Sequence, residues 1–371
     1  MKRLISVFFV TLFILSPFTS AHADPIVVRI VGPFNQTFTG EFRNDDLAQE
    51  LTPSGKLGQL VYVPQSKSKI WVIDPALIDE IASMTGDYKL ATGAKAIGSK
   101  IASNWLSQLQ KVSKDNDVIA LAYGNPDVAL AKSLAPSELK MYYAFGKSQL
   151  QLALMRIVRS EPNEGWSTGR SKLNALLRKN YSDNRKALTR LSRVVDSYDL
   201  MMMRLRLSRL LSPSLDKDAR EYFSYSAKAA VDAEVHKLRI NSGKYQVTTE
   251  SAKLPVTIIN QFPVPVVVDV AMVPMNSRVV VESFTGVTIP ANSKKQLELK
   301  LNVVAPGETT IFAQITDSKG VDIVSPSILQ INSTVIDKRV TWFTTGSAIL
   351  LLLAAVAQSV RRVRRGRKSE I

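Results

Sequence analysis

Residues 297–303 read LELKLNV, an alternation in which Leu297, Leu299, Leu301 and Val303 are apolar and the residues between them are polar. Successive side chains of a β-strand point to opposite faces, so the pattern predicts a strand with one face in a core and the other in water. The alternation recurs at residues 311–315, and turn-forming stretches follow one another at short spacings. Seven or eight short strands in about 95 residues predict an immunoglobulin-like β-sandwich over residues 241–336.

A helical segment, residues 160–240, precedes the sandwich. From Asp183 to Leu211 the apolar residues recur at spacings of three and four, which predicts one amphipathic helix. Ser212-Pro213 ends this helix and Ser214 caps the next, so a helical hairpin is expected. Between residues 170 and 209 eleven Lys or Arg residues stand against three Asp, a local charge of +8 (11 − 3) within a chain of net charge +16.

Residues 24–159 alternate between short β-branched runs and helical patterns. Strands are predicted at residues 25–31, 60–63, 70–73 and 118–123, and helices are predicted from Pro75, over 97–112 and again after Asp127. This rhythm is typical of parallel βα units, but the units are too few for a closed barrel. The fold class expected is α+β multidomain, with a partial α/β domain at residues 24–159.

An uncharged run, WFTTGSAILLLLAAVAQSV, occupies Trp342–Val360 near the C-terminus. As a helix it is about 28 Å long, close to the ~30 Å hydrocarbon core of a bilayer, so it is expected to be a C-terminal transmembrane helix in contact with the lipid bilayer. The basic tail, residues 361–371, is expected to act as a cytoplasmic stop-transfer signal. Its cations are Arg361, Arg362, Arg364, Arg365, Arg367 and Lys368.

The N-terminus resembles a secretory signal peptide over residues 1–23. Lys2 and Arg3 precede an apolar run, and Ala21 and Ala23 are small residues at a cleavage site, although an uncleaved anchor is the alternative. The expected location is the plasma membrane, single-pass type I, with the ectodomain outside and the C-terminus cytoplasmic. The chain has no cysteine, so disulfides do not contribute to its stability.

Several stretches resemble an uncharacterised family of actinobacterial cell-envelope proteins. They are residues 238–270 (LRINSGKYQVTTESAKLPVTIINQFPVPVVVDV), 287–320 (VTIPANSKKQLELKLNVVAPGETTIFAQITDSKG), 71–90 (WVIDPALIDEIASMTGDYKL), 101–110 and 119–127. Members are often encoded beside the flippase for the lipid-linked murein precursor. The resemblance implies a cell-surface protein linked to peptidoglycan assembly. It does not imply any enzymatic activity, because none is assigned to the family.

Metal and cofactor chemistry is not expected. His22 would leave with the signal peptide and His236 stands alone on a predicted helix, so zinc sites and Ser–His–Asp triads lack their ligands and bases. Nucleic acid is not an expected partner of an exported protein.

Asp74 and Asp127 are the candidate catalytic residues, because both follow predicted parallel strands, where α/β folds place their sites. Two carboxylates that flank a glycosidic bond can hydrolyse it. The simpler interpretation is that each one caps the helix that begins directly after it. This interpretation is favoured over catalysis.

The basic segment offers a second candidate site, for an anionic wall polymer, lipid headgroups or an acidic protein. Its members are Arg185, Lys186, Arg190, Arg193, Arg204, Arg206 and Arg209. The alternative is a solvated helix face. The function favoured is a non-enzymatic scaffold or binding protein that meets another membrane or cell-wall assembly protein. A carbohydrate-active hydrolase, or a degenerate sugar-binding protein, is the alternative.

Overall fold

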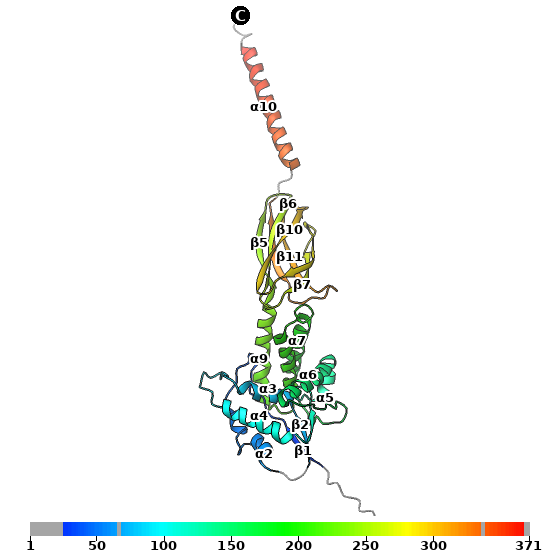
Figure 1. The fold of residues 1–371 in the computed structure, drawn as a ribbon. Helices are drawn as coiled ribbons and strands as arrows, with labels where there is room; N and C mark the ends of the chain where they lie inside the picture. Colours follow the sequence, from blue (N-terminus) through cyan, green and yellow to red (C-terminus); the bar gives the residue numbers. More distant parts are fainter. Residues whose placement is uncertain (1–24, 65–67, 335–337, 367–371) are drawn as a thin grey trace, which may run out of the picture.

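The computed structural model of the chain describes residues 25–64, 68–334 and 338–366. A small α/β layer lies at one end, helices α7 and α9 follow it, and a β-sandwich comes next along the long axis (Figure 1). The predicted signal peptide, residues 1–23, lies outside the described residues. The architecture is mixed α+β, as the sequence predicts.

Three parallel strands form the sheet of the α/β layer, in the order β1 (Ile26–Ile30), β2 (Lys69–Ile73) and β3 (Asp117–Ala120). Their β-branched residues suit a pleated sheet that is covered on both faces, as parallel sheets are. The sheet and its helices bury Trp71 and Trp105 completely. The predicted strands at residues 70–73 and 118–123 are confirmed, the latter in its first half.

Six helices pack around this sheet. They are α1 (Asp46–Glu50), α2 (Lys56–Tyr62), α3 (Pro75–Met84), α4 (Ser99–Ser113), α5 (Val128–Leu134) and α6 (Pro136–Leu154). The strand predicted at residues 60–63 is wrong, because most of it belongs to α2. Leu57 and Val61 are buried four residues apart on one face of α2, a spacing that a four-residue apolar run cannot reveal.

The helical region consists of α7 (Ala175–Leu191), α8 (Tyr198–Leu207), the 3₁₀ turn η1 (Ser208–Leu211) and α9 (Lys217–His236). The single helix predicted over residues 183–211 is therefore broken between α7 and α8. The Ser192 hydroxyl bonds back to the Leu188 carbonyl (2.8 Å), and Ser197 is extended, with φ −127°. Serine side chains compete with the helical backbone in this way. The break divides the basic residues between α7, the segment that follows it, α8 and η1.

The β-sandwich has one sheet in the order β4-β6-β10-β8 and a second in the order β5-β12-β11-β7-β9. The strands are β4 (Leu238–Ile240), β5 (Gly243–Val247), β6 (Ser251–Asn260), β7 (Val266–Pro274), β8 (Val279–Val281), β9 (Phe284–Ile289), β10 (Ser293–Val303), β11 (Gly307–Thr316) and β12 (Ser327–Ser333). Leu299 and Leu301 of β10 are buried, while Glu298 and Lys300 are exposed, as the alternation predicts.

The helical region and the sandwich share one hydrophobic core, which extends from Tyr142 of α6 through Leu188 of α7 to Ile315 of β11. A single residue, Lys237, separates the end of α9 from the start of β4. Across the same junction Arg193 forms an ion pair of 3.1 Å with Asp317. The sandwich is thus packed directly onto the helices.

The C-terminal helix α10 (Lys338–Gly366) corrects the predicted membrane span. Among the described residues no helix is both long enough and apolar enough to cross a membrane, so the transmembrane helix expected at residues 342–360 is wrong. The uninterrupted apolar run, Ala348–Ala357, has ten residues. As a helix it is about 15 Å long, half of a bilayer core. The stop-transfer role of the cations that follow depended on that span, and Arg367 and Lys368 lie outside the described residues.

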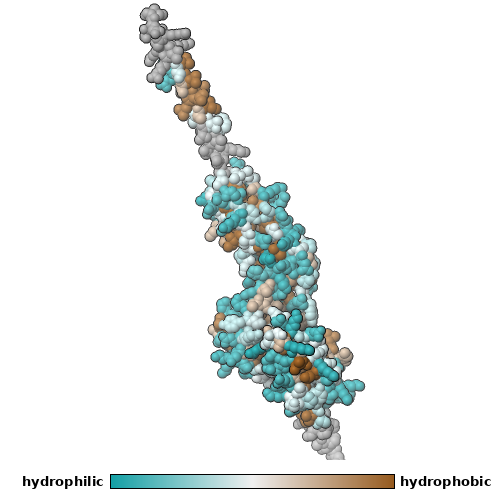
Figure 2. Space-filling view, turned by 90° about the vertical axis from the view of Figure 1, so that its left-hand side faces the viewer, coloured by the Kyte–Doolittle hydropathy of each residue, from teal (hydrophilic) through white to brown (hydrophobic). Residues whose placement is uncertain are grey.

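The described surface of the α/β layer and the sandwich is mainly hydrophilic, and hydrophobic residues gather on α10 (Figure 2). Smaller apolar patches are scattered over the rest. Isolated apolar side chains are normal on a protein surface, so they carry no inference by themselves.

Candidate functional site

Asp74 is an internal capping residue. It is 1% exposed, and its Oδ1 accepts hydrogen bonds from the backbone N–H groups of Ala76 (3.0 Å) and Gly124 (2.9 Å). Burial raises its pKa to about 7, although these N–H groups and Arg209 act in the opposite direction. The side chain joins the start of α3 to the loop after β3. The capping interpretation is confirmed for Asp74.

Asp127 caps α5 and also holds the loop before α7. Oδ1 accepts from the N–H groups of Ala129 (3.0 Å) and Leu130 (3.3 Å), and Oδ2 accepts from Ser171 N–H (2.9 Å). Burial alone would raise the pKa of this carboxyl, but these three donors and Arg170 bring it below its usual value. All of these bonds favour the charged carboxylate. Both predicted catalytic residues are thus occupied as helix caps, which gives the hydrolase pairing of Asp74 with Asp127 no support.

Replacing Asp127 by alanine should lower the free energy of unfolding by about 1–2 kcal/mol at neutral pH, the typical cost of a lost cap. The folded-state pKa lies below the unfolded value, so the stabilisation is present above that unfolded value and is lost as the pH falls through the folded one. Chemical denaturation at several pH values measures this. Asp216→Ala removes a cap with one N–H bond (Ala219, 2.7 Å) and is the matched control. An Asp127→Ala chain as stable as wild type at neutral pH would contradict the capping role.

The predicted anion-binding residues do not share one surface. Arg209 pairs with Glu80 (2.7 Å), Arg204 with Glu138 (2.8 Å) and Arg193 with Asp317. Arg206 and Arg185 are both half-buried. Arg206 donates a hydrogen bond to the carbonyl of Phe38, and Arg185 lies near the buried Tyr142. Within the described residues, Lys186 and Arg190 are the exposed members that form no ion pair.

A pocket of about 710 Å³ lies where the loop at residues 34–42 meets α3, α6, α8 and α9. We call it the junction pocket. Its volume lies within the ~300–1,000 Å³ that is usual for small-molecule sites. It is lined by Gln36, Phe38, Thr39, Asp79, Ala82, Ser83, Tyr123, Gln149, Tyr198, Asp199, Met202, Met203, Arg206, Ala230, Ala233 and Glu234.

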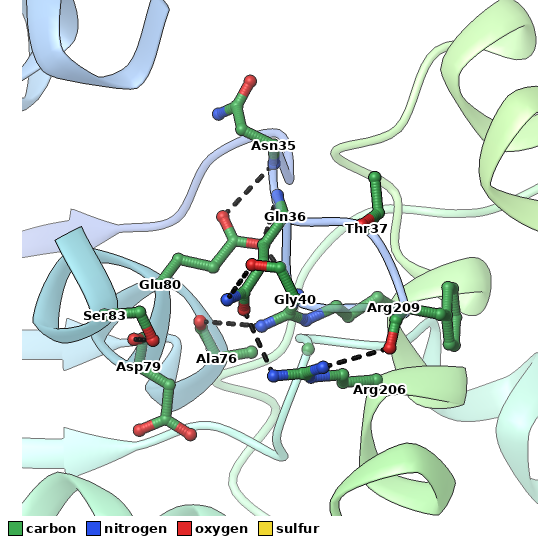
Figure 3. A network of polar contacts seen from close by, with 12 residues as sticks. Asn35, Gln36, Thr37, Gly40, Ala76, Asp79, Glu80, Ser83, Arg206 and Arg209 are labelled. Carbon is green, nitrogen blue, oxygen red and sulfur yellow. Dashed lines mark hydrogen bonds and ion pairs between the residues drawn. The ribbon is translucent and has the colours of Figure 1, made fainter. Parts of the chain in front are cut away.

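A buried ion pair, Glu80 with Arg209, lies beside this pocket. Arg209 is 4% exposed and Glu80 is fully buried, with 2.7 Å between Nη1 and Oε1. Glu80 also accepts from the N–H groups of Asn35 and Gln36, both at 3.2 Å, while Arg209 donates to the carbonyl of Ala76 at 3.1 Å (Figure 3). Burial lowers the pKa of Arg209, but Glu80 and other nearby acidic groups outweigh it and raise the pKa. The pair joins the loop, α3 and η1 into one unit.

Asp79 has fewer polar partners than its neighbour Glu80. Its carboxylate points away from the Glu80–Arg209 pair (Figure 3), and its Oδ2 atom is buried without a hydrogen-bond partner. Burial raises the pKa of Asp79 to about 6, although a hydrogen bond between the Tyr123 hydroxyl and this carboxylate and the guanidinium groups of Arg209 and Arg206 oppose the shift, so only the Oδ2 atom is unpaired. Buried polar atoms are almost always paired, so an unpaired carboxylate oxygen in a pocket wall marks a candidate site.

Arg206 is the cation of the junction pocket. It donates to the carbonyl of Phe38 (3.2 Å) and to Oε1 of Gln36 (3.4 Å). Burial and the nearby Arg209 lower its pKa. Its position is therefore fixed by the loop, and its hydrogen bonds to that loop use part of its donor capacity.

The carboxylates of the pocket do not form a metal site. Within the described residues, no three His, Cys, Asp or Glu side chains are grouped so that they can hold a metal ion. The arrangement can instead accept hydrogen bonds from a ligand at Asp79 and Asp199. Both residues were missed by the sequence reasoning. For Asp79, the sequence signal was the acidic pair Asp79-Glu80 within the otherwise apolar helix at residues 75–84.

Solved structures with similar segments cover about a quarter of the chain each. WR4, an MSP family member of C. elegans, has 14% identity, a TM-score of 0.20, and coverage of 26% of this chain and 98% of its own. The ASH/PapD-like domain of human CEP192 has 11% identity, a TM-score of 0.22, and coverage of 27% and 87%. The E. coli chaperone DraB has 13% identity, a TM-score of 0.19, and coverage of 26% and 55%. TM-scores this low support no functional inference.

No curated protein matches the chain. The model of one protein family does match, over residues 157–370, which is more than half of the sequence and includes the helical region and the whole sandwich. The chain therefore belongs to a family of unknown function, DUF6049.

Proposed function

We propose that the chain is a non-enzymatic binding protein and that the junction pocket is its ligand site. The observation that carries the proposal is the buried Oδ2 atom of Asp79, which has no partner in the described structure. An unpaired buried carboxylate oxygen costs stability, so a bound donor would recover free energy that the empty pocket loses.

The charges of the pocket favour a ligand with a positive charge and several hydrogen-bond donors. Asp79 and Asp199 form no ion pair within the described residues, whereas Glu234 is paired with Lys237 (2.5 Å). Arg206 is bonded to the loop. Tyr198 is exposed and adds aromatic surface to the lining, which suits the carbon face of a sugar or an alkyl ammonium group. A small hydroxylated amine combines these properties.

The biological setting belongs to the same proposal and rests on the sequence alone. It comprises export, an actinobacterial origin, and a link to cell-wall assembly through a protein or polymer partner. Lys186 and Arg190 are the part of the basic segment whose exposure supports contact with an anionic wall polymer.

A second candidate function is glycoside hydrolysis with different carboxylates from those first considered. Burial raises the pKa of Asp79 to about 6, as in general acids of glycosidases, and Asp199 is an exposed carboxylate on the same lining. Release of sugar from an oligosaccharide that depends on both Asp79 and Asp199 would favour it over simple binding.

The binding proposal is tested by titrating the full chain with glucosamine in a calorimeter. Asp79→Asn should weaken binding about tenfold to a hundredfold, because a charge-assisted hydrogen bond is worth about 1.5–3 kcal/mol. N-acetylglucosamine, which lacks the charge, and glucuronate, which reverses it, should bind more weakly than glucosamine to the wild type.

Asp87→Asn is the matched control, since Asp87 is exposed and lies outside the lining. It should bind glucosamine as the wild type does. Equal affinity of wild type and Asp79→Asn for glucosamine, or tightest binding of glucuronate, would contradict the proposal.

A further inference from the structure

A second concave site, the α5–α6 groove, lies on the α/β layer away from the junction pocket. It has a volume of about 510 Å³ and is formed by α5, α6 and the loop at residues 160–163. No residue that lines the junction pocket also lines this groove. It is lined by Val128, Lys132, Pro136, Leu139, Lys140, Tyr143, Ala144, Lys147, Ser160, Pro162 and Asn163.

The floor of the groove is an apolar stripe. Pro136, Leu139, Tyr143 and Ala144 are spaced three, four and one residues apart along α6, so they lie on one side of that helix. Pro162 of the loop adds to the apolar lining. A hydrocarbon chain fits such a floor, because it replaces water over apolar surface without leaving polar groups unpaired.

The rim of the groove is cationic. Lys132, Lys140 and Lys147 are all exposed, and none of them forms an ion pair within the described residues. The lining contains no Asp or Glu. Lys140 and Lys147 are about 10 Å apart along the helix axis, at 1.5 Å per residue. The charge of a ligand for this groove is therefore negative.

Ser160 supplies an independent observation. Ser160 lines the groove, and its Oγ atom is buried and has no hydrogen-bond partner in the described structure. A buried hydroxyl without a partner costs free energy, which an acceptor on a ligand would recover. An anionic oxygen is such an acceptor, so the hydroxyl and the lysines favour the same kind of headgroup.

From these features we infer that the α5–α6 groove binds a single-chain anionic lipid, with its hydrocarbon chain on the apolar stripe and its headgroup among the lysines and Ser160. The volume is that of a small-molecule site. The inference concerns a different site from the junction pocket, and its outcome is independent of the ligand proposed there.

The test uses the full chain and dodecyl phosphate below its micellar concentration, with binding measured by calorimetry and native mass spectrometry. Saturable binding is expected. Lys140→Gln/Lys147→Gln should weaken it about tenfold or more, which corresponds to the loss of at least one charge-assisted contact. Ala144→Trp should prevent it, because the indole fills the groove. Circular dichroism reports whether each variant is folded.

Lys111→Gln/Lys114→Gln is the matched control. It removes the same charge from two exposed lysines that lie outside the groove and should leave binding unchanged. Because α10 has the same sequence in all of these variants, any adsorption of the amphiphile on α10 should be the same in each. A difference in binding between them therefore reports on the groove.

Three results would overturn the inference. The first is an affinity for dodecyl maltoside, which has the same chain and no charge, equal to that for dodecyl phosphate. The second is complete displacement of dodecyl phosphate by inorganic phosphate alone. The third is binding of dodecyl phosphate by the groove variants with the affinity of the wild type. Binding of an acidic amphipathic peptide in the groove, without binding of dodecyl phosphate, would assign the site to a protein partner instead.

Discussion

Replacing Arg209 by methionine should lower the free energy of unfolding by about 3–5 kcal/mol at neutral pH, the usual cost of removing one partner of a buried ion pair. The remaining carboxylate of Glu80 is fully buried and would keep only the two backbone N–H bonds from Asn35 and Gln36. Chemical denaturation followed by circular dichroism measures the loss. It is a large fraction of the ~5–15 kcal/mol that stabilises a typical domain.

The double variant Glu80→Gln/Arg209→Met should recover part of this loss. The neutral amide no longer leaves an uncompensated charge in the interior. Asn35 N–H and Gln36 N–H bond to different oxygens of Glu80, so the single amide oxygen keeps one of these two bonds and the recovery is only partial. The coupling energy from the double-mutant cycle is the part that belongs to the pair itself. A double variant less stable than the sum of the two single losses would contradict this account.

An exposed ion pair provides the matched control. Lys228 and Asp232 are four residues apart on α9, at 2.9 Å, with side chains 52% and 62% exposed. Such pairs contribute about 0.3–0.5 kcal/mol. Lys228→Met should therefore change stability by less than 1 kcal/mol. A loss for Arg209→Met as small as that for Lys228→Met would show that the buried pair is not a structural clamp.

The local parts of this fold could be predicted from the sequence, because their signals lie within a few residues. The alternation at 297–303 predicts β10, and an Asp before a helical pattern predicts the caps at Asp74 and Asp127. Each pattern follows from the geometry of one element. Local patterns failed where a short run suits two structures, as in α2, or where serine side chains end a helix, as after Leu191.

The junction pocket could not be predicted, because its residues meet through long-range packing. Asp79 and Arg206 both line the pocket but are 127 residues apart (206 − 79), and the other lining residues come from the loop, α3, α6, α8 and α9. The basic segment illustrates the same limit: its charge count is correct, but the count does not show which arginines turn inward to buried acids. Arg204 and Arg209 were predicted to bind anions on the surface, but in the structure they form ion pairs with the buried Glu138 and Glu80.

Asp79→Asn should make the protein more stable than the wild type at pH 8, by about 3 kcal/mol. Burial raises the pKa of Asp79 from its usual 3.8 to about 6. That is a shift of about two units, and each unit corresponds to 1.36 kcal/mol. Between these two pKa values the folded state binds more protons than the unfolded state, so the contribution of Asp79 to stability falls as the pH rises through this window.

The difference between the two proteins should therefore be small below pH ~4, grow up to about pH 6–7, and stay constant above it. Asp74, whose pKa burial raises to about 7, lowers stability over a similar range but is present in both proteins and cancels in the comparison. Asp87→Asn, at an exposed site, should show no such pH dependence. Chemical denaturation at pH 4, 6 and 8 provides the measurement.

The sign of this effect decides more than the stability of one helix. A carboxylate that destabilises the free protein, and whose removal also weakens glucosamine binding, has the properties of a binding residue whose cost is offset by its ligand. If Asp79→Asn is instead less stable than the wild type at pH 8, the charged carboxylate is well satisfied in the folded protein. The junction pocket would then have no unpaired acceptor to offer, and the binding proposal would lose the observation on which it rests.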